Sequence, residues 1–207
     1  VQRFLEQDCV REGHVLRNRH TGRRVRAVIA VDLLGHPADV RTIGALCDYH
    51  GLQLIEDATE SLGAWRHGRA VGSEARYAAF SFNGNKLLTT GGGGMFVTDD
   101  AALAARARYL TTQAKDDAVE FVHGAVGWNY RLTNVQAAIG VAQLEQLPAF
   151  VARKRQIRAR YAAAFADIAS VRVLGEAPWA RSACWMLTVL LSPEANCTRH
   201  DLAARLA

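Results

Sequence analysis

Short apolar runs that end at polar loops limit the folds open to this chain more than any other feature. Residues 52–55 (Leu-Gln-Leu-Ile) and 77–82 (Tyr-Ala-Ala-Phe-Ser-Phe) are such runs, and residues 27–34 form an earlier one. Their length and flanking turn residues are typical of buried strands. Residues 38–50, between the runs at 27–34 and 52–55, carry one apolar stripe at helical spacing and end at Gly51. This succession predicts a βαβ unit, and therefore an α/β fold with a mainly parallel sheet and flanking helices.

The rest of the chain is predicted to alternate in a similar way. Strands are expected at residues 76–82, 95–97, 171–173 and 185–191, and helices at 101–112, 133–147, 149–168 and the C-terminus. Residues 113–131 lack periodicity, and a loop of this length is more often functional than idle. We expect residues 1–148 to be part of a large domain whose N-terminal portion is missing. Residues 149–207 are then a linking helix and the truncated start of a small α+β C-terminal domain, so the chain is expected to be a fragment.

An acid and a lysine follow two of the predicted strands. Asp57 comes directly after the run at 52–55, and Lys86 follows the run at 77–82. Open α/β sheets bind ligands at the carboxyl ends of their strands, so both side chains should face one site. A primary amine can form a Schiff base with pyridoxal 5′-phosphate (PLP), and a carboxylate can keep the pyridine nitrogen protonated. Alone, Asp57 is more simply a helix cap or a Mg²⁺ ligand and Lys86 a surface lysine, so the argument depends on the pair.

Four segments in a fixed order carry a resemblance to a known family. They are residues 55–64 (IEDATESLGA), 81–86 (SFNGNK), 89–95 (TTGGGGM) and 127–134 (GWNYRLTN). Together they resemble the DegT/DnrJ/EryC1/StrS aminotransferases, fold-type I PLP enzymes that aminate nucleotide-linked keto-sugars. The resemblance extends from about residue 26 to residue 190. The segment SFNGNK, with TQAKD downstream at residues 112–116, is most similar to the branch that makes UDP-N-acetylbacillosamine precursors.

The resemblance implies a role for individual residues of the PLP site. Lys86 would be the Schiff-base lysine and the general acid/base, and Asp57 would pair with the pyridine nitrogen. Glu60 would lie near the phenolic oxygen of PLP, and Ser81 would hydrogen-bond its phosphate. The glycine run at 91–94 would let the backbone pass close to cofactor or substrate, where a Cβ would clash.

The resemblance also implies partners and a reaction. Asn129, with Arg131 as its companion, would reach into the neighbouring subunit's site to bind phosphate, which implies a homodimer with shared active sites. Glutamate would give its amine to PLP, and a nucleotide-linked 4-keto-6-deoxy sugar, expected to be UDP-linked, would collect it for polysaccharide or glycan precursor biosynthesis. The family's phosphate loop and ring-stacking aromatic lie upstream of this chain. The fragment alone is therefore expected to be inactive, and its parent active.

Three other functions compete with the aminotransferase hypothesis. A sugar 3-dehydratase of the same family carries histidine in place of the lysine, so Lys86 argues against it. A non-catalytic or regulatory relative is disfavoured by the intact pair of Asp57 and Lys86. A nucleotide-binding α/β domain without PLP is weakened by the absence of a G-x-G-x-x-G motif.

Composition excludes several other classes of protein. The formal net charge is +5, but no aromatic residues interleave with the clustered arginines, so we expect no nucleic-acid partner. An anionic small-molecule substrate also suits a basic protein. No apolar run approaches the roughly 20 residues that span a bilayer, which predicts no membrane association and a cytoplasmic location. The 4 cysteines lack C-x-x-C spacing and nearby histidines, so we expect reduced thiols and no metal site.

Overall fold

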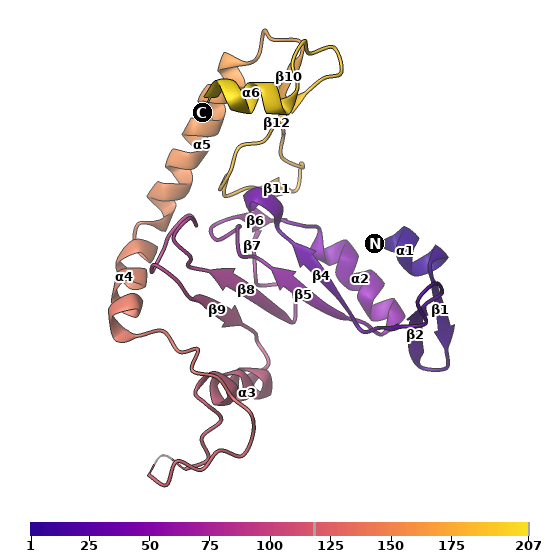
Figure 1. Ribbon diagram of the computed structural model, residues 1–207, viewed down its shortest axis with the longest axis vertical. Coiled ribbons are helices and arrows are strands. Elements are labelled where there is room, and N and C mark those ends of the chain that lie inside the picture. Colours follow the sequence, from indigo (N-terminus) through magenta and orange to yellow (C-terminus); the bar gives the residue numbers. More distant parts are fainter. Residues whose placement is uncertain (118, 207) are drawn as a thin grey trace.

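The computed structural model describes residues 1–117 and 119–206, and a four-stranded sheet lies at its centre (Figure 1). The strands are β4 (Ala27–Val31), β5 (Gln53–Asp57), β8 (Tyr77–Ser81) and β9 (Gly94–Val97), in the order β4-β5-β8-β9. The first three pair in parallel, and β9 joins β8 antiparallel. The prediction of an α/β fold with a mainly parallel sheet is confirmed.

Helix α2 (Val40–His50) connects β4 to β5 and covers one face of these strands. Asp39 caps its first turn by accepting a hydrogen bond from the Thr42 N–H (3.1 Å), as short polar residues do at helix starts. Gly51 ends it in a left-handed conformation with φ 69°. The predicted βαβ unit is therefore present, with its helix two residues shorter than expected at the start.

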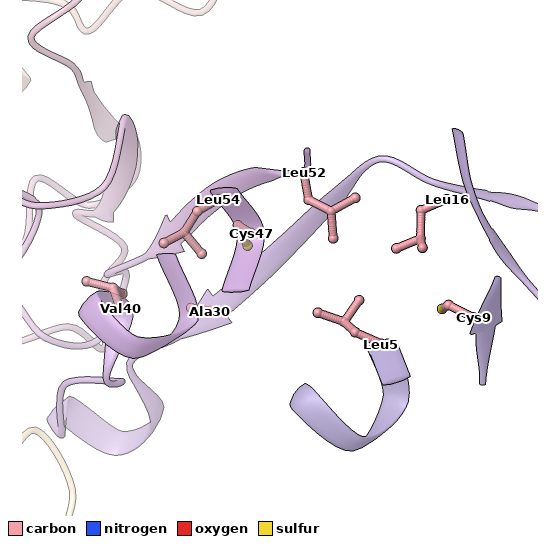
Figure 2. Close-up of a cluster of buried hydrophobic side chains, with 8 residues drawn as sticks. All are labelled: Leu5, Cys9, Leu16, Ala30, Val40, Cys47, Leu52 and Leu54. Carbon is pink, nitrogen blue, oxygen red and sulfur yellow. The ribbon is translucent and has the colours of Figure 1, made fainter. Parts of the chain in front are cut away.

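The main apolar core links α2 to the N-terminal segment (Figure 2). That segment comprises α1 (Gln2–Gln7) and a small antiparallel sheet of β1 (Cys9–Glu12), β2 (Val15–Asn18) and β3 (Arg24–Val25). The buried side chains of this core come from the N-terminal segment, from α2 and from β4 and the start of β5, and they are Leu5, Cys9, Leu16, Ala30, Val40, Cys47, Leu52 and Leu54. Residues 1–25 carried no predicted element, because their strands are too short for a periodic signal.

The C-terminal half begins with helices and then returns to the sheet domain. Its elements are α3 (Ala101–Thr111), α4 (Asn134–Leu144), α5 (Leu147–Ala164), β10 (Val171–Val173), β11 (Ala180–Arg181), β12 (Val189–Leu191) and α6 (Arg199–Leu206). Strand β11 pairs with β6 (Trp65–Arg66), which forms a hairpin with β7 (Arg69–Ala70). The predicted domain boundary at 148/149 falls at the start of α5, and residues from its far side contact the large domain again at β11. The division into two domains stays a prediction.

Two predicted strands are longer than those observed. The strand expected at 27–34 ends at Val31, because Leu34 and Gly35 turn the chain with φ values of 58° and 89°. The strand expected at 185–191 begins only at Val189. The first residues of the predicted strand lie against the loop after β4 instead, where the Met186 N–H donates to the Leu34 carbonyl (3.4 Å). Tertiary contacts replaced strand pairing in both places.

Within the part of the chain that the structure describes, no helix is both long enough and apolar enough to cross a membrane.

Candidate active site

Asp57 is the last residue of β5, at the carboxyl edge of the parallel strands. It pairs with Val31 of β4 on one side and with Ala79 of β8 on the other. Its Oδ1 accepts a hydrogen bond from the Thr59 N–H (3.2 Å), a short turn that orients the half-buried carboxylate. The acid therefore lies where the sequence predicted it, at the end of a central strand.

Lys86 lies in the loop after β8, and its amine reaches the loop after β5. Its backbone N–H donates to the Asn83 carbonyl (3.1 Å), which turns the loop. The side chain is only 14% exposed, and its Nζ lies 3.5 Å from Oε1 of Glu60. Since Glu60 follows Asp57 by three residues, the structure places the amine against the loop that Asp57 begins.

Glu60 joins three loops of this edge. One carboxylate oxygen faces the Lys86 amine, and the other accepts a hydrogen bond from the Leu34 N–H (2.7 Å) in the loop after β4. A carboxylate that accepts a hydrogen bond from a backbone N–H is restricted in its rotation. Glu60 therefore fixes the position of the charge that faces the amine.

Trp185 is a member of this site that the sequence analysis did not identify. Its ring centroid lies 4.4 Å from Lys86 Nζ, and its indole N–H donates to the Asn85 carbonyl (2.8 Å). The residue is 7% exposed. It lies about a hundred positions from Lys86 in the chain, so no local pattern could have assigned it to the site.

A buried acid, Asp32, connects the loops of this site by hydrogen bonds. Asp32 follows β4, is fully buried, and accepts hydrogen bonds from the Ser61 hydroxyl (2.6 Å) and the Ala38 N–H (2.7 Å). Burial raises the pKa of Asp32 to about 6, against the lowering effect of those two hydrogen bonds. Its own N–H donates to the Asp57 carbonyl (3.0 Å), so it ties the loop after β4 to the end of β5.

Ser81 and the glycine run lie at the other side of the edge. Ser81 ends β8, pairs with Gly94, and its Oγ accepts from the Asn83 N–H (3.3 Å). A Cβ on Gly94 would collide with the Phe80 carbonyl, so this glycine is needed for the pairing of β9 with β8. Open space surrounds the Cα atoms of Gly91 and Gly92. Only these two keep the predicted property of backbone that a ligand could approach.

Asn129 and Arg131 belong to the segment between α3 and α4, and Leu132, next to Arg131, lies against Gly93 of the glycine run. Asn129 forms an antiparallel bridge with Thr112, at the end of α3. Both side chains are exposed. In the described parts of the chain neither forms a hydrogen bond or ion pair with Asp57, Glu60 or Lys86.

The described residues contain no group of three or more His, Cys, Asp or Glu side chains arranged to hold a metal ion.

Comparison with known proteins identifies the family. Residues 14–207 match the model of the DegT/DnrJ/EryC1/StrS aminotransferase family. The chain belongs to this family. Its relatives in the family include EpsN of Bacillus subtilis, named as a pyridoxal phosphate-dependent aminotransferase. The two are 42% identical over 91% of this chain and 48% of EpsN.

Other DegT-family members agree in sequence and in structure. The GDP-perosamine synthase of Caulobacter vibrioides is 40% identical over 86% of this chain and 48% of its own length. The crystal structure of Streptomyces venezuelae DesV, solved in complex with a ketimine intermediate, superposes with a TM-score of 0.79 at 34% identity. The match covers 88% of this chain and 48% of DesV. The chain thus spans about half the length of the curated relatives it matches.

Proposed function

We propose that the full-length protein is a PLP-dependent aminotransferase that moves an amino group from glutamate to a nucleotide-linked 4-keto-6-deoxy sugar. The single observation that carries the proposal is the largely shielded Lys86 amine, 3.5 Å from Glu60 and beside the loop that Asp57 begins. Membership of the aminotransferase family supports it.

The residues of the site fit PLP by their chemistry. An amine and a carboxylate stand on loops that follow neighbouring parallel strands, and a hydroxyl, Ser81, ends the second strand. Lys86 would hold the cofactor covalently, Asp57 would hold its pyridine nitrogen and Ser81 its phosphate. When bound, PLP supplies a ring that accepts the electron pair left when a proton is removed from the substrate.

The chain's own residues then have separable tasks. The Lys86 amine takes the proton from the substrate carbon and returns it, which requires the neutral amine close to the reacting atoms. The Asp57 carboxylate keeps a proton on the ring nitrogen by charge attraction. Glu60, fixed by the Leu34 N–H, holds the free amine at the edge of the site between proton transfers.

The nucleotide and the sugar are the finer part of the proposal. The segments SFNGNK and TQAKD resemble those of enzymes that act on UDP-linked sugars, so we propose a UDP-linked acceptor for surface polysaccharide or glycan precursors. The relatives carry other nucleotides in their names: GDP in the perosamine synthase of Caulobacter vibrioides, and dTDP in a transaminase of Streptomyces venezuelae. A comparison of the three nucleotides is therefore the decisive measurement.

The test is amine transfer by the full-length protein, with glutamate as donor and a panel of UDP-, GDP- and dTDP-linked 4-keto-sugars. We expect a visible absorbance band from lysine-bound PLP, amino-sugar formation, and fastest turnover with the UDP-linked sugar. Lys86→Ala should abolish the band and lower turnover by at least about a thousandfold, because the covalent attachment and the acid/base group are lost together. Arg24→Ala, which removes an exposed basic side chain on β3, is the control. A band that persists in Lys86→Ala would remove Lys86 from this role.

A further inference from the structure

We infer that Trp185 is a positioning residue for Lys86, and that its ring and the Glu60 carboxylate together form a seat for the free lysine amine. This inference rests on the proposed function in one respect, the identity of Lys86 as the reacting amine. Its geometry comes from contacts among the chain's own residues.

The amine lies between two partners of complementary kinds. The indole ring of Trp185 faces it with the centroid 4.4 Å from Nζ, within the range in which an ammonium is attracted by the π-face of tryptophan. The Glu60 carboxylate is 3.5 Å away. A carboxylate alone would leave the long lysine chain several rotamers, whereas a flat ring removes those that it blocks. The two contacts together select one position of the amine.

Trp185 is itself held more firmly than a surface aromatic. Its indole N–H donates to the carbonyl of Asn85, the residue immediately before Lys86 (2.8 Å). The Lys154 amine of α5 donates to its backbone carbonyl (3.2 Å). One side chain therefore contacts the backbone that precedes Lys86 and also the end of the Lys86 side chain.

The segment around Trp185 is bound to the loop that also holds Glu60. The Ala183 N–H donates to the Gly35 carbonyl (3.0 Å), and Gly35 is so close that a Cβ there would lie 2.8 Å from the Trp185 nitrogen. Cys184, between Ala183 and Trp185, has a φ of 53°, so the backbone turns in a left-handed conformation just before Trp185. The tryptophan and the glutamate are thus fixed to the same short loop, residues 33–35, and face the same amine.

For function, these contacts give the free Lys86 amine one defined position to which it returns in each catalytic cycle. A lysine that exchanges proton and covalent partner during a cycle must come back to the same place each time, because a displacement of about 1 Å can cost two orders of magnitude in rate. The seat supplies that place from outside the cofactor. It also shields the amine from solvent while the amine is free.

The primary test is chemical labelling of the full-length protein with PLP removed. Amine acylation by acetic anhydride, followed by mass spectrometry of the peptides, gives separate rates for Lys86 and Lys115. Trp185→Leu should raise the Lys86 rate about threefold or more, the size expected for loss of one cation–π contact together with its shielding. The Lys115 rate should stay unchanged. Trp185→Phe, which keeps a ring but no N–H, should remain within about twofold of the parent.

Trp179→Leu is the matched control, because Trp179 stacks on His67 (5.4 Å) and not on Lys86. It should leave the Lys86 rate unchanged. If Trp185→Leu does not fold, as shown by faster labelling of Lys115, Trp185→Met takes its place, because the unbranched methionine side chain adapts better to an irregular space. Equal Lys86 rates in the parent and in the folded variant would overturn the inference.

A second measurement uses the PLP-loaded full-length protein. In rapid mixing with glutamate, loss of the visible band should be about tenfold slower in Trp185→Leu than in the parent, with PLP affinity within about twofold. Equal loss of rate and of PLP affinity would indicate general damage and contradict a positioning role. If the parent shows no visible band, the proposed function is contradicted. If the band forms but the labelling rate of Lys86 is the same with and without Trp185, only this inference is contradicted.

Discussion

At the scale of single residues, the site depends on which charges are buried and how each is compensated. Lys86 and Glu60 keep 14% and 19% of their side chains exposed and face each other. Asp32 is fully buried and has only neutral donors, a hydroxyl and a backbone N–H. The difference explains why burial raises the pKa of Asp32 to about 6. An acid beneath the site therefore titrates near neutral pH.

This titration predicts a pH-dependent stability. A carboxyl whose pKa rises on folding binds its proton more tightly in the native state, so its contribution is full below the unfolded pKa, near 4, and is lost as pH rises through about 6. The loss is on the order of 2 kcal/mol between pH 4 and pH 7, because part of it has already occurred at pH 4. Asp32→Asn removes the ionisation and keeps the shape of the side chain. The free energy of unfolding in urea should therefore fall by this amount from pH 4 to pH 7 in the parent, relative to the Asp32→Asn variant.

The matched control for this prediction is Asp48→Asn, at an exposed position on α2. It should leave the pH profile of unfolding as it is in the parent. Parallel profiles for the parent and Asp32→Asn would show that Asp32 does not ionise in this interval.

At the scale of elements, sequence patterns predicted the parts that obey local rules. The strands that end at Asp57 and Ser81 are buried and short, and their apolar runs locate them to within a residue. The structure adds two caps of the same local kind, since the side chains of Asp39 and Asp100 accept hydrogen bonds from the first turns of α2 and α3. The strand expected at 185–191 was too long, because its first residues are held by Leu34 and Gly35, which lie more than a hundred positions away in the chain.

The loop of residues 33–35 is the element on which these distant contacts converge, and Gly35 tests it. Its φ is 89°, and a Cβ would lie 2.8 Å from the Trp185 nitrogen and 3.2 Å from the Glu60 carbonyl. Gly35→Ala should therefore lower the unfolding free energy by ~2–4 kcal/mol, as strain and overpacking add. Thermal and urea unfolding of the full-length protein measure the loss.

Gly22→Ala provides the comparison at the same scale. Gly22 has a similar positive φ of 67°, but nothing lies within 4 Å of its would-be Cβ. Only the backbone term applies there, about 1–2 kcal/mol. Equal losses at the two positions would mean that the contacts of Gly35 with the Trp185 segment contribute nothing.

At the scale of the whole molecule, the proposed site residues fall into two groups that come from different segments of the chain. Asp57, Glu60, Ser81 and Lys86 gather at the sheet edge, whereas Asn129 and Arg131 lie on the segment between α3 and α4 (Figure 1). Helix α4, which follows that segment, exposes a set of large apolar side chains, Val135, Ile139, Val141 and Leu144. An apolar surface of this kind beside polar residues is typical of an interface. We therefore propose a homodimer in which the second group completes the partner's site.

If two subunits share each site, two inactive variants should restore activity when they form a mixed dimer, which a monomer could not do. Lys86→Ala and Asn129→Ala should each reduce amine transfer severely as pure proteins, and co-expression of the two should restore part of it. In a mixed dimer, one site inherits both substitutions and the other has Lys86 from one subunit and Asn129 from its partner, so one site is complete. A mixture of Lys86→Ala with Asp57→Ala is the control, because both residues belong to the sheet-edge group of one subunit and no mixed dimer contains a complete site. Recovery in both mixtures, or in neither, would contradict the sharing of sites between subunits.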